Sequence, residues 1–144
     1  MEETGKRAKM KVASEAIRSW SEALGRELET WPGVTLKGAF GMTMAYRDGV
    51  VFAALPRTRA IYEEDAILLK FHRETPRLLA RFASESRLAA GTMEKRGSTK
   101  SKKRGESHHW RIFLMRADPD VHDAIEWLAE AYRLAATKQR KSAS

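Results

Sequence analysis

The residues with the clearest chemical potential form a short basic segment. Six cations fall within residues 95–104 of a 144-residue chain whose formal charge is +8. Closely spaced cations displace counterions from a phosphate backbone, which favours salt-sensitive, sequence-independent binding of nucleic acid. No aromatic residue is interleaved among them, so base stacking is not predicted there, and a solvated charge run is the alternative interpretation. The candidate nucleic-acid contacts are Lys95, Arg96, Lys100, Lys102, Lys103 and Arg104.

The remaining positive charge lies at the two ends of the chain. Residues 12–94 and 105–137 together hold fourteen basic and seventeen acidic residues, so the expected folded body is slightly acidic. Residues 1–11 and 138–144 are interpreted as basic tails. A nucleic-acid-binding domain usually presents a basic folded face. The charge distribution does not predict such a face, and nucleic-acid binding would use the basic segment and the tails.

Other titratable residues form no recognisable catalytic or metal-binding pattern. His108 and His109 are adjacent, and neighbouring strand residues point to opposite faces, so their rings cannot easily share one ion. Glu63, Glu64 and Asp65 offer carboxylates to a divalent cation, but calcium loops need more ligands at defined spacing, so a solvated loop is favoured. The chain has no cysteine, no nucleophile elbow and no phosphate-binding glycine loop. We expect no enzymatic activity, no metal and no cofactor.

Hydrophobic spacing predicts the helices that position these residues. Apolar residues three or four apart indicate a helix within Val12–Glu29 and another from Asp118 to about Ala136. Thr75 followed by Pro76 has the form of an N-cap and a first helical position. A middle helix is therefore expected to begin there, to carry apolar residues inward and to fade near Leu88.

Extended segments are predicted between the helices. Asp48-Gly49 between two apolar runs is a strong signal for a tight hairpin turn. The order α-β-β-β-β-α-β-α then predicts an α+β domain with an antiparallel sheet of about five strands and helices packed on one face. The expected strands are Val34–Phe40, Gly41–Tyr46, Val50–Leu55, Ala66–Phe71 and His109–Met115.

The expected domain covers residues 12–137. Residues 95–108 lack any apolar side chain to bury, so we interpret them as a flexible basic loop inside the domain. Trp127 lies one position from Leu128 and off the centre of its helix stripe, so it either packs in the core or is partly exposed and a candidate partner contact. No apolar run approaches the ~20 residues that cross a bilayer, and no signal-peptide core is present. These features predict a cytoplasmic protein without a membrane partner.

Short motifs between Trp31 and Ala136 follow the order of a known family. Together they resemble the N-terminal domain of the TfoX/Sxy regulators, with related progressions in the MmcQ/YjbR and CyaY-like proteins. The motifs are Pro32–Thr35, Lys37–Met42, Tyr46–Ala53, Leu68–Lys70, Thr92–Glu94 and Ile125–Ala135.

The resemblance implies a sheet-plus-helix fold and a non-catalytic regulatory module. Such a module would act by binding a protein partner, including a second copy of itself. Non-specific nucleic-acid binding through the basic segment and tails is the alternative function.

Overall fold

The computed structural model describes residues 11–60, 65–90 and 110–143, which form three helices beside a six-stranded antiparallel sheet. The predicted α+β class and the element order are confirmed, and the short strands β1, β5 and β7 are additions. The six strands pair in the order β2-β3-β4-β6-β8-β7, while β1 pairs with β5. The elements are β1 (Lys11–Val12), α1 (Glu15–Leu28), β2 (Val34–Ala39), β3 (Met42–Arg47), β4 (Val50–Pro56), β5 (Arg59–Ala60), β6 (Ala66–Lys70), α2 (Pro76–Ser84), β7 (Leu88–Ala90), β8 (Trp110–Leu114) and α3 (Asp120–Ala143).

Side-chain caps fix the starts of the first two helices. The Ser14 hydroxyl oxygen accepts a hydrogen bond from the Ile17 amide at 3.1 Å, and Thr75 does the same for the Leu78 amide at 3.1 Å. Each cap satisfies an amide that has no partner within its helix. The predicted N-cap at Thr75 is therefore confirmed.

Two helix ends differ from the sequence prediction. The middle helix, α2, ends at Ser84 rather than near Leu88. Leu88 begins β7, which pairs with β8, and only 9% of Leu88 is exposed, so sheet pairing and burial outweigh the helical pattern there. The last helix, α3, continues to Ala143 instead of ending near Ala136.

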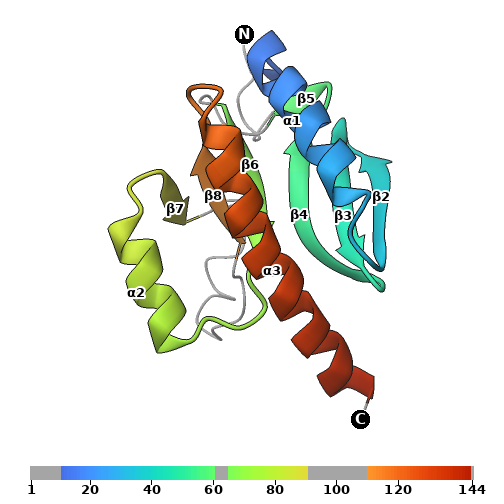
Figure 1. Ribbon diagram of the computed structural model, residues 1–144. Coiled ribbons are helices and arrows are strands. Elements are labelled where there is room, and N and C mark those ends of the chain that lie inside the picture. Colours follow the sequence, from blue (N-terminus) through green and yellow to red (C-terminus); the bar gives the residue numbers. More distant parts are fainter. Residues whose placement is uncertain (1–10, 61–64, 91–109, 144) are drawn as a thin grey trace, which may run out of the picture.

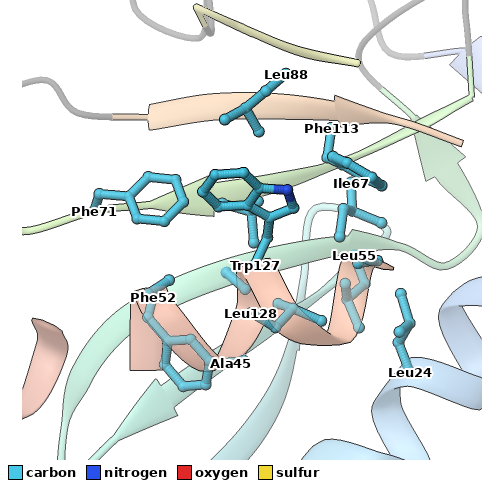
Figure 2. Close-up of a cluster of buried hydrophobic side chains, with 14 of the residues drawn as sticks. Leu24, Ala45, Phe52, Leu55, Ile67, Phe71, Leu88, Phe113, Trp127 and Leu128 are labelled. Carbon is cyan, nitrogen blue, oxygen red and sulfur yellow. The ribbon is translucent and has the colours of Figure 1, made fainter. Parts of the chain in front are cut away.

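The helices pack on one face of the sheet. In Figure 1, α3 and α1 cross the strands, and α2 lies toward the β7–β8 edge. The large core cluster contains buried residues of all three helices together with strand residues. Trp127 reaches from α3 toward Phe71 in Figure 2, with ring centroids 6.1 Å apart. Phe82 of α2 completes this aromatic group, 5.0 Å from Phe71 and 5.6 Å from Trp127.

Two hairpins in this sheet turn through a pair of residues with positive φ. Asp48 and Gly49 have φ angles of 48° and 87°, and Phe40 and Gly41 have 54° and 78°. Positive φ at both central residues is what a type I′ turn requires, and Asn-Gly or Asp-Gly is its preferred sequence. The predicted hairpin at Asp48-Gly49 is confirmed. Phe40 occupies the equivalent position in the β2–β3 turn, although a bulky residue is strained there.

We predict that Phe40→Asn stabilises the protein by about 1 kcal/mol, because asparagine tolerates the left-handed conformation better than phenylalanine. Phe40 is 83% exposed, so its removal leaves little buried area unfilled. Urea unfolding followed by circular dichroism measures the change. Asp48→Asn is the matched control and should alter stability little, since aspartate already suits its turn. A loss of stability in Phe40→Asn would contradict the prediction.

Candidate functional site

One face of the sheet carries no helix among the described residues, and we call it the open face. Cross-strand partners lie on the same side of a sheet, so the pairing register identifies its members. Three of them, Met42, Ala54 and Leu68, form a buried cluster that is separate from the helix-side core. The open face, as used below, comprises Thr35, Lys37, Met42, Met44, Tyr46, Ala54, Leu68, Lys70, Trp110 and Ile112.

Each of the two aromatic rings on the open face has a lysine beside it. The Lys37 ammonium lies 5.4 Å from the centroid of the Tyr46 ring, and the Lys70 ammonium lies 5.5 Å from that of Trp110. Both distances fall within the range of cation–π attraction. Tyr46 and Trp110 are half-buried, so part of each ring remains accessible.

The two aromatic–lysine pairs flank an apolar centre. Tyr46 belongs to β3 and Trp110 to β8, with β4 and β6 between them. Three strand spacings place the backbones of these residues roughly 14 Å apart. Met44 and Ile112 pack on the buried cluster between them. The open face therefore offers two separated rings, with the partly buried Met44 and Ile112 between them above a buried cluster.

The strands themselves contain no acidic residue. The sequences of β2, β3, β4, β6, β7 and β8 hold four charges, all of them basic. Arg47 and Arg111 face the helices: Arg47 donates to the Tyr132 carbonyl at 3.2 Å, and Arg111 donates twice to Glu74 at 3.0 Å. Lys37 and Lys70 face the other way. The open face is thus weakly positive, a feature that the overall charge distribution did not predict.

A second charged cluster joins α3 to the turn between α2 and β7. Arg87 donates to Glu85 at 2.7 Å and to Asp120 at 2.8 Å, and lies 3.0 Å from Asp123. The hydrogen bond from Arg87 lowers the pKa of Glu85, against the effect of burial. Hydrogen bonds from backbone amides, chiefly that of Arg116, lower the pKa of the Asp120 carboxyl. The Arg87 side chain lowers it further. Every member is engaged within the fold, so this cluster is structural.

The β2–β3 turn presents an exposed aromatic side chain on a rigid base. The Gly41 carbonyl accepts hydrogen bonds from the amides of Arg57, Thr58 and Arg59 at 3.1, 2.8 and 3.0 Å. A Cβ at Gly41 would lie 2.5 Å from the Arg59 side chain, so only glycine fits this approach. Phe40, beside it, packs on little and is 83% exposed.

Several residues that the sequence singled out lie outside the described part of the chain. These include the basic segment 95–104, the His108-His109 pair, and Glu63 with Glu64. Asp65 is described, and it accepts a hydrogen bond from the Ser14 hydroxyl at 2.8 Å, which gives it a structural role. Within the described ranges, no group of three His, Asp or Glu side chains could hold a metal ion. No helix in those ranges is long and apolar enough to span a membrane.

Of the two alternatives for Trp127, core packing is correct and partial exposure is wrong. Only 6% of Trp127 is exposed, because α2 closes over this side of α3 and packs Phe82 against the indole. Arg81 of α2 also stacks on the indole, 4.5 Å from the ring centroid. The indole therefore offers almost no surface to a partner. The sequence also favoured core packing over base stacking for Trp110, which is half-buried on the open face, and Tyr46 was not singled out.

No protein-family model, curated protein or solved structure matches the chain. The resemblance to the TfoX/Sxy N-terminal domain therefore stays a prediction. The open face and the exposed turn at Phe40 are the features on which a functional proposal can rest.

We predict that Arg87→Met lowers the free energy of unfolding at pH 7 by about 1–3 kcal/mol, because it removes charge-assisted hydrogen bonds. The lowered pKa values of Glu85 and Asp120 stabilise the fold above their ordinary values of 4.5 and 3.8. This contribution is lost as the pH falls through the folded-state values. The difference between parent and variant should therefore shrink in acid. Urea unfolding between pH 7 and pH 3 measures it, and a difference independent of pH would contradict the assignment.

Proposed function

We propose that the protein binds single-stranded nucleic acid on the open face of its sheet. The observation that carries the proposal is the pairing of Tyr46 with Lys37 and of Trp110 with Lys70 on a face whose strands contain no carboxylate. Proteins that bind single strands combine aromatic platforms, on which bases stack, with cations that follow the phosphate backbone.

Each group on the open face would have a distinct role. Tyr46 and Trp110 would each stack on one base, and this requires no particular base because every base has a π-face. Lys37 and Lys70 would neutralise nearby phosphates. The partly buried side chains of Met44 and Ile112 would exclude water from the stacked bases. The absence of strand carboxylates removes the repulsion that would otherwise oppose a polyanion.

The basic segment would add electrostatic attraction without base recognition. Residues 95–104 carry six cations and precede Trp110 in the sequence. The sheet would supply the base stacking that the basic segment lacks. The segment would supply most of the positive charge, because the open face has only two lysines. We therefore expect two separable contributions to the binding affinity: one is lost on aromatic substitution, and the other weakens as the salt concentration rises.

We predict that Tyr46→Leu or Trp110→Leu weakens binding of an oligothymidine by roughly 1–3 kcal/mol each, the cost of losing one stacked base. Fluorescence anisotropy with a labelled oligomer measures the dissociation constant. Tyr46→Phe and Trp110→Phe keep a π-face and should retain most of the affinity. Duplex DNA should bind less tightly, because its bases are already stacked on one another.

A charge-matched control separates the open face from the general basicity of the chain. Lys70→Gln and Arg77→Gln remove the same charge, but Arg77 lies exposed on α2, on the helix side. Only Lys70→Gln should weaken binding clearly. Equal losses in both variants, or unchanged affinity in the leucine variants, would contradict an open-face site.

We further predict that replacing residues 95–104 with a Gly/Ser linker reduces the salt dependence of binding. Six lost phosphate contacts would lower the slope of log affinity against log salt by up to about 4 for a single strand. Stability should change by less than about 1 kcal/mol, as for surface changes away from packed features. Anisotropy at a series of salt concentrations and thermal unfolding measure the two quantities. An unchanged slope would remove the segment from the binding mechanism.

Protein contact is the second candidate function, and the exposure of Phe40 favours it. A large apolar side chain held out on a rigid turn, in a conformation that destabilises the fold, suits insertion into a partner's pocket. The resemblance to a regulatory family supports the same function. Light scattering on the parent and on Phe40→Asn tests self-association through this turn. An unchanged monomer in both, together with oligonucleotide binding, would favour nucleic acid as the ligand.

A further inference from the structure

One edge of the six-stranded sheet is a long strand that no other described strand covers. Figure 1 shows this strand, β2, at the right-hand edge of the sheet, and β7 ends the strand order on the other side. β7 has three residues, whereas all six residues of β2 pair with β3 in an uninterrupted register. Natural sheets keep their edges short, bulged or charged, because a long regular edge pairs readily with another chain. The only charge in β2 is Lys37.

The turn between β2 and β3 determines which backbone groups point outward from this edge. A two-residue turn makes the residues that flank it, Ala39 and Met42, a hydrogen-bonded pair. Hydrogen-bonded and non-hydrogen-bonded pairs alternate along an antiparallel ladder. The N–H and C=O groups of every second residue of β2 therefore point away from β3, and these residues are Val34, Leu36 and Gly38.

The outward row of backbone groups is complementary to a second copy of itself. The Val34 amide donates to the Trp31 carbonyl at 3.2 Å, and no other group of the row has a partner among the described residues. A two-fold axis beside Leu36 would pair Leu36 with its own copy and Gly38 with Val34. Both Leu36 amides and both Gly38 amides would then donate across the junction. A centre at Lys37 would instead set two lysines directly opposite each other, which destabilises a strand pair.

The side of α1 that borders β2 carries charges of alternating sign. Arg18, Glu22, Arg26 and Glu29 follow one another at spacings of three and four, so they lie along one side of the helix. All four are exposed, and they line one recess together with Leu36 of β2. The ion pairs among the described residues lie on other elements, so these charges are available to a second copy.

The same two-fold axis would bring these helix charges together in pairs of opposite sign. Leu36 Cδ1 lies 3.8 Å from the point where a Cβ at Gly25 would stand, so the axis lies near the level of Gly25. The two copies of α1 would lie on the same face of the joined sheet and run antiparallel. About that level, Glu22 would face Arg26 of the second copy, and the outer two charges would likewise meet with opposite sign.

Phe40 lies at the end of this edge and would also meet the second copy. In the register centred on Leu36, Phe40 is level with Pro32, which is exposed. The Pro32 carbonyl accepts a hydrogen bond from the Tyr132 hydroxyl at 2.7 Å, so α3 holds this segment in place. The 83% exposed Phe40 side chain would thus pack on an ordered apolar surface at both ends of the junction.

We propose that two copies of the chain associate through antiparallel pairing of their β2 strands, with a two-fold axis beside Leu36. An interface of this kind must be complementary to itself, and both the backbone row of β2 and the charges of α1 meet that condition. A peptide of unrelated sequence would match only the backbone row. The proposal rests on the second candidate function, protein contact, and does not depend on nucleic-acid binding.

Sedimentation equilibrium of the full chain at micromolar concentration, without nucleic acid, should give twice the mass of one chain. Gly38→Pro removes an outward amide from each copy and should raise the dissociation constant of the dimer at least about tenfold. Gly38→Ala is the matched control: it keeps the amide, and its side chain meets the same end of the flexible Arg57 side chain. It should remain dimeric. A monomeric parent, or equal dissociation constants for Gly38→Pro and Gly38→Ala, would overturn the proposal.

Charge exchange on α1 tests the orientation with the β2 backbone intact, and so it also applies if Gly38→Pro fails to fold. Arg26→Glu would set it against Glu22 of the second copy and should raise the dissociation constant about tenfold. Adding Glu22→Arg restores opposite signs and should recover the parental value. No recovery in the double variant would show that the helices do not face each other.

Engineered thiols report the register, because the chain contains no cysteine. Thr35 and Lys37 would form a non-hydrogen-bonded pair across the junction, whose Cα separation of ~4.5 Å suits a disulfide. A mixture of Thr35→Cys and Lys37→Cys should therefore cross-link faster on mild oxidation than either variant alone. A dimer that Phe40→Asn dissociates, but that forms no mixed disulfide, would reject β2 pairing while keeping protein contact through the turn.

Discussion

The packing of α3 against the centre of the sheet is the contact on which the rest of the structure depends. Ala124, Ala131 and Ala135 are fully buried, and such small side chains bring the helix close to the strands. Trp127 fills the wider space toward α2, where its ring contacts that of Phe71 (Figure 2) and that of Phe82. Because α1 and α2 pack on the same side as α3, the three helices complete one hydrophobic core, and none of them covers the other face of the sheet.

This one-sided packing also places arginines and lysines of the sheet on opposite faces. Three arginines on the helix side have carboxylate or carbonyl partners within the fold: Arg47 with Tyr132, Arg87 with Glu85, and Arg111 with Glu74. The lysines of the sheet point the other way and lie beside aromatic rings. Partnered arginines stabilise the contacts between elements, whereas the two lysines lie on described strands that contain no acidic residue.

The sequence was most informative where local chemistry decides the structure. The Thr75-Pro76 helix start and the Asp48-Gly49 turn were predicted correctly because caps and tight turns depend on a few adjacent residues. The end of α2 was missed because pairing between β7 and β8 joins distant residues. The burial of Trp127 was left undecided for a similar reason: it comes from α2, which no helical pattern of α3 reveals. The open face was not foreseen, since Tyr46 and Trp110 are far apart in the sequence and only the strand order brings them to one surface.

The three amides that converge on the Gly41 carbonyl have a consequence for recognition. They join the β2–β3 turn to the segment that follows β4. A side chain carried on such a base is already ordered before any encounter. Association through Phe40 would therefore lose little backbone entropy, unlike association through a loop that must first become ordered. The turn would therefore present Phe40 in a preformed conformation, and binding would depend on the shape of the partner's pocket.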